Sequence, residues 1–281
     1  MPKKTTARKN RKNNNQSGAF AQVVADLHVV WIFFTRLPWP GDYWPGADSR
    51  KNIPTVKLST AARAFPFAGI IIGAIGALVL FVGARAGLHP LAASILAIGA
   101  GMLASGAIHE DGLADVFDGF GGGANKTQKL EIMKDSRIGT YGMAALIITT
   151  VLKATLLAGF PGPGMAAGAL FIANVLPRAG LPLMMVMLKP AKKSGLGHGA
   201  GTPKKDDAII SVVIGALVAA LVFGLSVGII ALLAAGLGMA LMGYIAKRQI
   251  GGLSGDVLGG AEQIGENFVL VFLAIIFASA F

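Results

Sequence analysis

The sequence contains no cysteine and few charged residues. Of its 281 residues, 14% are Asp, Glu, Lys or Arg and 54% are hydrophobic, and the mean hydropathy is +0.65. Because it has no thiol, the chain forms no disulfide, Cys-ligated zinc site or Fe–S cluster. A soluble domain is about one quarter charged, so the low charge excludes an ordinary soluble enzyme. The composition predicts an all-α, polytopic integral membrane protein.

Acidic residues are scarcer than basic ones, with 14 Asp and Glu against 25 Lys and Arg, and the net charge is +11. Such a charge could indicate nucleic-acid binding, but its distribution argues against that partner. Six basic residues fall within the first twelve positions, and no acid precedes Asp26. This pattern is typical of a cytoplasmic tail that obeys the positive-inside rule. We therefore predict a disordered tail over residues 1–19 and a single membrane-embedded catalytic domain over residues 20–281.

Long apolar runs predict about seven transmembrane helices, because a helix needs about 20 apolar residues to cross the hydrocarbon layer. One run, residues 208–246, has 39 residues without a charge. At 1.5 Å per residue it would reach about 58 Å, roughly twice the hydrocarbon thickness, so we expect it to fold back near residues 224–228. The other predicted spans are 67–86, 91–108, 143–160, 165–188 and 268–281, and the last is short, so we expect the preceding residues to help it cross.

The segment 20–36 is apolar on one helical face but is interrupted by Asp26, His28 and Arg36. We expect an interfacial helix that does not cross the membrane. Residues 37–66, 109–142, 189–207 and 247–266 then lie on the same side as the tail. Together with the tail and this helix, they hold 22 of the 25 Lys and Arg residues. The positive-inside rule therefore predicts that the N-terminus and these segments are cytoplasmic.

A dense group of carboxylates follows the second apolar run. Glu110, Asp111, Asp115 and Asp118 lie within nine residues. On a helix the three Asp residues share one face, where like charges repel one another. A hard divalent cation would offset this repulsion, and Mg²⁺ binds carboxylate oxygens together with substrate phosphates. The group predicts a metal and phosphate site, with a solvated acidic helix end as the alternative.

The segment after the carboxylates offers groups that bind anions. A glycine-rich stretch at 120–125 can expose backbone N–H groups. Lys134 and Arg137 are candidate phosphate ligands, because an arginine guanidinium binds an oxyanion with two hydrogen bonds. Asp135 is a candidate metal ligand or an orienting group for a base. A plain charged loop is the competing interpretation.

Two basic residues, Lys153 and Arg178, interrupt predicted spans. A charge inside the membrane costs several kcal/mol unless it is paired or hydrated, so we expect both side chains to face a polar interior, with snorkelling as the alternative. Near the C-terminus, a glycine-rich turn at 250–260 carries Asp256 to the cytoplasmic edge, where it could contact a metal or phosphate.

Several segments occur together in an order that one family shares. The most specific is 109–142, from His-Glu-Asp-Gly-Leu-Ala-Asp at its start to Leu-Glu-Ile-Met-Lys-Asp-Ser-Arg-Ile-Gly-Thr-Tyr-Gly at its end. The others are Phe-Thr-Arg-Leu-Pro at 34–38, Ala-Phe-Pro-Phe-Ala-Gly at 64–69, Pro-Arg at 177–178 and Gly-Gly-Leu-Ser-Gly-Asp at 251–256. From about residue 20 to the C-terminus, the chain resembles the cobalamin synthase family (adenosylcobinamide-GDP ribazoletransferase). Ser254 stands where Thr is expected, which keeps a hydroxyl.

The resemblance implies an enzyme of the bacterial cytoplasmic (inner) membrane that uses Mg²⁺. It implies transfer of the phosphocobinamide moiety of adenosylcobinamide-GDP to the 3′-hydroxyl of α-ribazole or its 5′-phosphate. The products would be adenosylcobalamin, or its 5′-phosphate, and GMP. The implied partners are these substrates and the lipid bilayer, and the oligomeric state stays open, a homo-oligomer included.

Residue roles follow from this implied reaction, since a diphosphate substrate needs charge neutralisation and in-line positioning. Asp118 or Asp135 would serve as general base, and the cations would stabilise the transferring phosphoryl group or the leaving GMP. The predicted metal ligands are Glu110, Asp111, Asp115 and Asp118; the predicted catalytic residues are Asp118, Asp135, Lys134 and Arg137; the predicted substrate-binding residues are Arg36, Arg63, Arg178 and Asp256.

Two other functions compete with this one. A CDP-alcohol phosphotransferase that makes phospholipid also uses diphosphate and metal chemistry, but the spacing of its aspartates differs from that at 111–118. A membrane transporter with an acidic cytoplasmic gate would explain charged residues within spans. Against transport, the acids gather at one membrane edge and not at the midplane.

Overall fold

The computed structural model describes residues 21–39, 58–191 and 200–278, which are mostly helical. Among these residues there is no strand, and one isolated bridge joins Pro190 to Leu253. A helix over Ala21–Phe34 comes first. It is followed by η2 (Leu58–Ala64), α2 (Phe65–Arg85), α3 (Pro90–Ser105), α4 (Ile108–Gly122), α5 (Lys126–Ile132), α6 (Thr140–Ala158), α7 (Pro163–Met187), α9 (Lys205–Phe223), α10 (Leu225–Ile250) and α11 (Gly255–Ala278).

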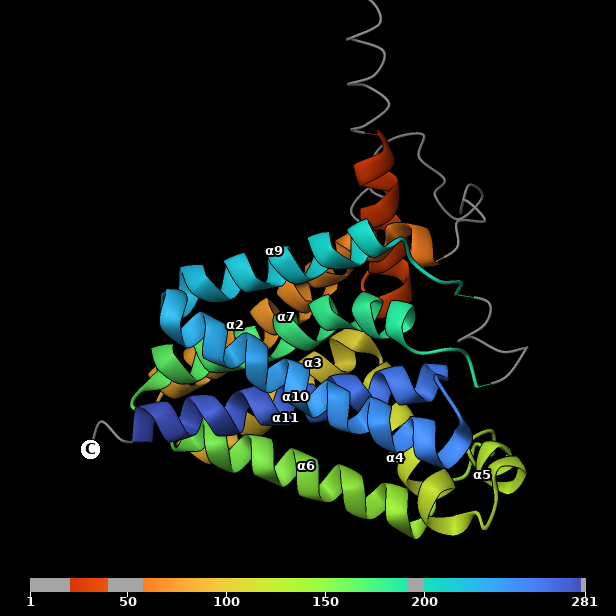
Figure 1. Cartoon of the computed structure of the whole chain (residues 1–281). Helices are drawn as coiled ribbons and strands as arrows, with labels where there is room; N and C mark the ends of the chain where they lie inside the picture. Colours follow the sequence, from red (N-terminus) through yellow and green to blue (C-terminus); the bar gives the residue numbers. More distant parts are fainter. Residues whose placement is uncertain (1–20, 40–57, 192–199, 279–281) are drawn as a thin grey trace, which may run out of the picture.

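Six helical segments are long and apolar enough to cross a membrane: η2 with α2, α6, α7, α9, α10 and α11. In Figure 1 the long helices lie side by side as one bundle. The helix α3 is shorter and forms a bent pair with α4, which raises the number of spans to seven if the pair counts as one. The predicted polytopic helical bundle is confirmed, and the chain is a multi-pass membrane protein. The predicted tail over residues 1–19 lies outside the described residues.

The long charge-free run folds back where it was expected to. The helix α9 ends at Phe223 and α10 begins at Leu225, with Gly224 between them at φ +79°. This left-handed conformation is accessible to glycine because glycine has no Cβ. One residue is therefore enough to reverse the chain between two spans.

The bend between α3 and α4 places the acidic helix across the bundle. The two helix axes differ by 94°, and the turn uses Gly106 at φ +68° and Ala107 at φ +55°. The backbone N–H of Arg36 donates to the Ala104 carbonyl at 2.8 Å, just before the bend. Because α4 runs across the direction of the spans, we place it outside the membrane-spanning segments.

The last span is longer than the predicted segment 268–281. The helix α11 begins at Gly255, so residues 255–266, which were assigned to a cytoplasmic segment, are continuous with the last span, and the preceding residues do extend it as expected. Four polar residues on two successive turns of α11 are buried: Glu262, Gln263, Glu266 and Asn267. Their charges and amides lower the local hydropathy, which hid the first half of the helix.

The helix Ala21–Phe34 is too short to cross a membrane by itself. Its Phe34 packs against Phe65 at the start of α2, with ring centroids 5.0 Å apart. Its Asp26 accepts a hydrogen bond from Arg63 Nε at 2.7 Å and forms an ion pair with it. These contacts fix the helix to the bundle, while its interfacial location stays a prediction.

Small residues let the helices α2 and α7 approach closely. A Cβ on Gly69 would lie 2.5 Å from the Asn174 carbonyl oxygen, and one on Gly73 would lie 2.9 Å from the Phe171 carbonyl oxygen. Such contacts are typical of transmembrane helix packing, where small side chains allow backbones to touch. These glycines therefore allow the close packing of α2 against α7.

Two apolar clusters fill the bundle, and a polar layer separates them. Along α7, one cluster reaches Leu176 and the other begins at Leu181, with Arg178 between them. Along α11, Ala261 belongs to one cluster and Val269 to the other, with the four buried polar residues between them. The buried ionisable groups of α6, α7 and α11 therefore meet at one depth inside the protein.

Candidate active site

The acidic face of α4 meets the first turn of α11. A Cβ on Gly112 would lie 2.9 Å from the Asp256 carbonyl oxygen, and one on Gly259 would lie 3.1 Å from the His109 carbonyl oxygen. These two glycines let the helix backbones touch, which brings Asp256 beside Asp115. The structure therefore joins two predicted site segments that are more than 130 residues apart in the sequence.

The electrostatics at this contact favour a bound cation. Burial raises the pKa of Asp115 to about 7, and the negative charges of Asp111, Asp256 and Asp118 add to the effect. Neighbouring carboxylates disfavour one another's ionised forms. Asp111 is exposed, while Asp115 and Asp256 are half-buried. A cation at this place would relieve the repulsion between them.

The carboxylate oxygens at this contact meet part of what a hard divalent cation requires. In the described part of the chain, no three His, Asp or Glu side chains are arranged closely enough to hold a metal ion by themselves. Mg²⁺ does not need such a cage, since it usually binds one or two carboxylates and takes its remaining ligands from substrate phosphates and water. Asp111, Asp115 and Asp256 supply oxygen ligands of the appropriate kind and sign.

Asp118 has a different environment from the other aspartates of α4. It is 8% exposed, and its two oxygens accept hydrogen bonds from the backbone N–H groups of Gly139 at 2.7 Å and Gly142 at 2.8 Å. These N–H groups lie at the start of α6, where a negative charge is favourable because of the helix dipole. The geometry fits an anchor for α6 better than the predicted metal ligand or general base.

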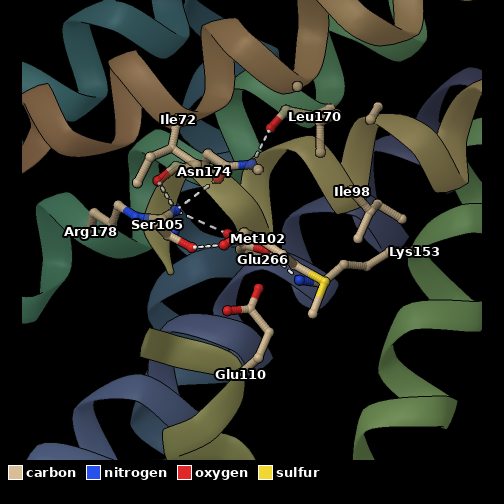
Figure 2. A pocket seen from close by; sticks show the side chains of 13 residues that line it. Ile72, Ile98, Met102, Ser105, Glu110, Lys153, Leu170, Asn174, Arg178 and Glu266 are labelled. Carbon is tan, nitrogen blue, oxygen red and sulfur yellow. Dashed lines mark hydrogen bonds and ion pairs between the residues drawn. The ribbon is translucent and has the colours of Figure 1, made fainter. Parts of the chain in front are cut away.

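Glu110 points away from this face. Its Oε1 accepts a hydrogen bond from Gln263 Nε2 at 3.2 Å, and its side chain lines a cavity together with Lys153, Arg178 and Glu266 (Figure 2). The predicted metal ligands therefore differ in their contacts, because Glu110 bonds to Gln263 and Asp118 bonds to the start of α6. Asp111 and Asp256 lie near enough to Asp115 to raise its pKa.

The loop between α5 and α6 carries the predicted phosphate-binding cations. Arg137 and Asp135 form an ion pair, with Nη2 and Oδ2 2.7 Å apart, and both are solvent-exposed. Hydrogen bonds from Arg137 lower the pKa of Asp135 to about 2. A general base works best with a pKa near the operating pH, so Asp135 is poorly suited to the base role predicted for it. Lys134 is exposed and lies beside this pair.

The predicted substrate-binding arginines do not lie together. Arg63 pairs with Asp26 on the N-terminal helix, and Arg36 packs against Gly106 at the bend before α4. Arg178 is 2% exposed and lies in the polar layer. Asp256 is the one member of the predicted set that reaches the carboxylate face of α4.

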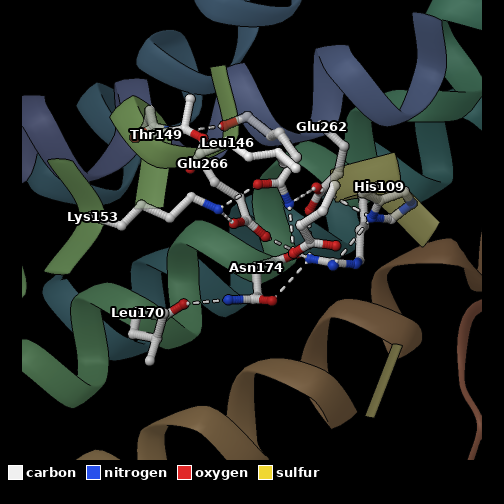
Figure 3. A network of polar contacts seen from close by, with 12 residues as sticks. His109, Leu146, Thr149, Lys153, Leu170, Asn174, Glu262 and Glu266 are labelled. Atoms are coloured by element: carbon white, nitrogen blue, oxygen red, sulfur yellow. Dashed lines mark hydrogen bonds and ion pairs between the residues drawn. The ribbon is translucent and has the colours of Figure 1, made fainter. Parts of the chain in front are cut away.

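The polar layer is a connected network, which Figure 3 shows. Arg178 Nη1 lies 2.5 Å from Glu262 Oε1 and 3.0 Å from Glu266 Oε1. Lys153 pairs with the other oxygen of Glu266. Arg178 also donates to Asn174 Oδ1 at 2.9 Å. Both span cations are thus paired inside the bundle, as expected, and neither snorkels.

The partners of these cations were not predicted from the sequence. Glu262 and Glu266 were placed in a cytoplasmic segment, and Asn174 and Gln263 were given no role. A signal was present, because Glu262 and Glu266 are four residues apart and lie on one helical face. Lys153 and Arg178 lie in other predicted spans, and a cation inside the membrane needs an anionic partner.

A small cavity adjoins this network. Its volume is about 20 Å³, which is room for about one water molecule. Glu110, Lys153, Asn174, Arg178 and Glu266 provide its polar lining. The cavity is too small for a substrate.

Several known proteins are similar to this chain over most of its length. The chain is 41% identical to the adenosylcobinamide-GDP ribazoletransferase of Bradyrhizobium diazoefficiens, over 90% of this chain and 94% of that protein. It is 43% identical to the protein of the same name from Azorhizobium caulinodans, over 91% and 97% of the two chains. The Mesorhizobium japonicum protein of that name is 38% identical, over 92% and 96%.

No solved structure matches the chain significantly. The comparisons give no support to the CDP-alcohol phosphotransferase or to the transporter. The match to the family extends over residues 26–274, which include α4, the loop after it and most of α11. On this evidence, the chain belongs to the cobalamin-5-phosphate synthase family.

Proposed function

We propose that this protein is a membrane-embedded transferase. It transfers the phosphocobinamide moiety of adenosylcobinamide-GDP to the 3′-hydroxyl of α-ribazole or α-ribazole 5′-phosphate. The observation that carries the proposal is the carboxylate face formed by Asp111, Asp115 and Asp256, which suits a metal-bound diphosphate. The names of the relatives supply the identity of the substrates. The product would be adenosylcobalamin or its 5′-phosphate, released with GMP.

The reaction exchanges one phosphorus–oxygen bond for another. The 3′-oxygen of the ribazole forms a bond to the phosphorus on the cobinamide side of the diphosphate. The bond from that phosphorus to the bridging oxygen breaks, and GMP leaves with this oxygen. The hydroxyl proton passes to solvent. Such a transfer needs positioning and charge stabilisation more than covalent chemistry by the protein.

The chain's own residues divide this work between two segments. Asp111, Asp115 and Asp256 would hold Mg²⁺, which when bound neutralises charge on the diphosphate. Lys134 and Arg137 would bind phosphate oxygens from the exposed loop after α5. Asp118 keeps this loop near α4 by accepting hydrogen bonds from the N–H groups at its end. The two cations would thus approach the same diphosphate.

We further propose that the N-terminus and the site face the cytoplasm of a bacterial inner membrane. Of the 25 Lys and Arg residues, 22 lie in the tail, the N-terminal helix and the four segments predicted on that side, as the positive-inside rule expects of cytoplasmic segments. Accessibility of single introduced cysteines to a membrane-impermeant thiol reagent tests it directly, because the chain has no cysteine of its own. Labelling from the periplasm at residue 137 would contradict the orientation.

The experiment for the activity uses detergent-solubilised protein with adenosylcobinamide-GDP, α-ribazole and Mg²⁺. GMP and cobalamin are followed by chromatography, with and without a chelator. We expect both products to appear together and only with the metal. In Asp111→Asn, turnover should nearly vanish with expression unchanged, because the cation loses a ligand.

The matched control is Asp206→Asn, which changes an exposed aspartate at the start of α9. It should keep wild-type rates. Wild-type rates in Asp111→Asn would contradict the metal assignment. GMP without cobalamin would indicate a hydrolase, and neither product from folded protein would contradict the proposed function.

A further inference from the structure

One buried amide connects three helices. Gln263 of α11 is 2% exposed. Its Oε1 accepts a hydrogen bond from Lys153 Nζ of α6 at 2.6 Å. Its Nε2 donates to Glu110 Oε1 of α4 at 3.2 Å and to Glu262 Oε2 at 3.0 Å. Because an amide has one acceptor end and one donor end, these partners fix its orientation.

The first turn of α4 needs such a contact. Its N-cap residue is Ala107, in a left-handed conformation and with no side-chain capping bond. The turn is held by side chains that enter the polar layer instead. The His109 ring nitrogen Nδ1 lies 3.2 Å from Arg178 Nη2 and 3.2 Å from Glu262 Oε2. Glu110 supplies the second attachment through Gln263.

The rotation of α4 about its axis decides where its aspartates point. Asp111 follows Glu110 directly, and Asp115 lies on the same rigid helix slightly more than one turn later. Each residue of a helix is turned by about 100° from the one before it. A contact that fixes Glu110 toward the interior therefore fixes Asp111 and Asp115 toward Asp256.

We propose that Gln263 is a positioning residue for the carboxylate face of α4. It touches neither substrate nor metal, and it acts by holding Glu110. The inference rests on the proposed function, since it assigns the metal to Asp111, Asp115 and Asp256. Groups that hydrogen-bond a metal ligand directly typically change metal affinity by about 10- to 100-fold when they are replaced, and Gln263 acts one residue further away, through Glu110, so we expect an effect at the lower end of this range.

The test compares two buried polar residues of α11. Gln263→Met keeps the side-chain length and removes both ends of the amide. The matched control is Asn267→Leu, one turn further along, because Asn267 is 5% exposed and donates to the Gln263 carbonyl within α11 itself. Both variants remove a buried amide from the same helix, so both carry the loss of stability that comes from removing such a group.

Two measurements on detergent-solubilised protein without substrate separate the variants. The dissociation constant of Mn²⁺, measured by electron paramagnetic resonance, should rise about tenfold or more in Gln263→Met and stay near the wild-type value in Asn267→Leu. Amide hydrogen exchange over residues 108–118 should accelerate in Gln263→Met alone. If Gln263→Met fails to fold, Gln263→Glu replaces it, because it keeps the acceptor for Lys153 and loses the donor to Glu110.

The outcomes are distinguishable. Equal Mn²⁺ dissociation constants in wild type and Gln263→Met, or equal exchange of α4 in the two variants, would overturn this inference alone. A wild-type protein that binds no Mn²⁺ would overturn the metal assignment and this inference with it. Weaker Mn²⁺ binding and faster α4 exchange confined to the Gln263 variants is the expected result.

Discussion

Removing the charge of Arg178 should destabilise the protein more than any loss of packing at that position would. The guanidinium is 2% exposed and lies between two carboxylates, one of which belongs to the fully buried Glu262. In Arg178→Met the side-chain volume is largely kept, but Glu262 and Glu266 lose their shared cation. Lys153 still pairs with Glu266, so Glu262 becomes the uncompensated charge.

The magnitude follows from the burial of this pair. Breaking a buried ion pair by removing one partner typically costs about 3–5 kcal/mol, because the remaining charge stays out of water without compensation. At about 1.4 kcal/mol per tenfold, this changes the unfolding equilibrium by roughly two to four orders of magnitude. The double variant Arg178→Met with Glu262→Gln removes the orphaned charge as well, so it should recover about 0.5–3 kcal/mol.

The assay is a titration of the protein in mild-detergent micelles with a denaturing detergent, followed by circular dichroism. Arg85→Met is the matched control, because Arg85 is exposed at the end of α2. Its guanidinium carbon lies 5.9 Å from the centre of the Phe81 ring. This variant should change stability by about 0.5 kcal/mol or less. The reasoning is refuted if Arg178→Met costs no more than Arg85→Met, or if the double variant is less stable than Arg178→Met.

Three more predictions concern packing, the α6 anchor and the exposed loop. Gly69→Ala should cost about 1–3 kcal/mol by crowding the backbone of α7, whereas Gly99→Ala, whose Cβ meets nothing within 4 Å, should not lower the thermal midpoint; equal midpoints would contradict this packing. Asp118→Asn should cost about 1–3 kcal/mol, because one amide oxygen cannot replace two carboxylate acceptors, and unchanged hydrogen exchange at the start of α6 would argue against it. In the loop, the lowered pKa of Asp135, about 2 against an ordinary 3.8, means a stabilising contribution that is present above about pH 4 and lost as the pH falls to about 2. Arg137→Gln should return this pKa toward 3.8 in a carbon-13 NMR titration, and a pKa that stays at about 2 would show that the ion pair is not its cause.

The spans were predictable because a bilayer imposes a length and an apolar composition on each of them. The reversal at Gly224 followed from the same arithmetic, since a run of 39 apolar residues is too long for one crossing. The predicted segment 268–281 covers only the later part of α11, because charged residues lower the hydropathy of the earlier part. That earlier part carries Glu262 and Glu266, and hydropathy cannot tell a charge that is paired inside a bundle from one in water.

The carboxylate site was predicted from local spacing, and spacing reports only what one helix does. It placed Asp111 and Asp115 together correctly. It could not show that Asp118 would be used by α6, since the hydrogen bonds come from backbone N–H groups 21 and 24 residues away. Nor could it show that Glu110 would turn inward to Gln263, 153 residues away.

Stability alone does not explain why the layer between the two apolar clusters is ionic. Replacing a buried ion pair by well-packed apolar side chains is often neutral or stabilising. Apolar contacts are non-directional, so an apolar layer could bury the first turn of α4 without fixing its rotation. Hydrogen bonds depend on angle as well as distance, and those of His109 and Glu110 reach α4 from two other helices, α7 and α11. We therefore infer that the ionic layer fixes the rotation of α4 about its own axis. That rotation determines which aspartates of α4 point toward Asp256.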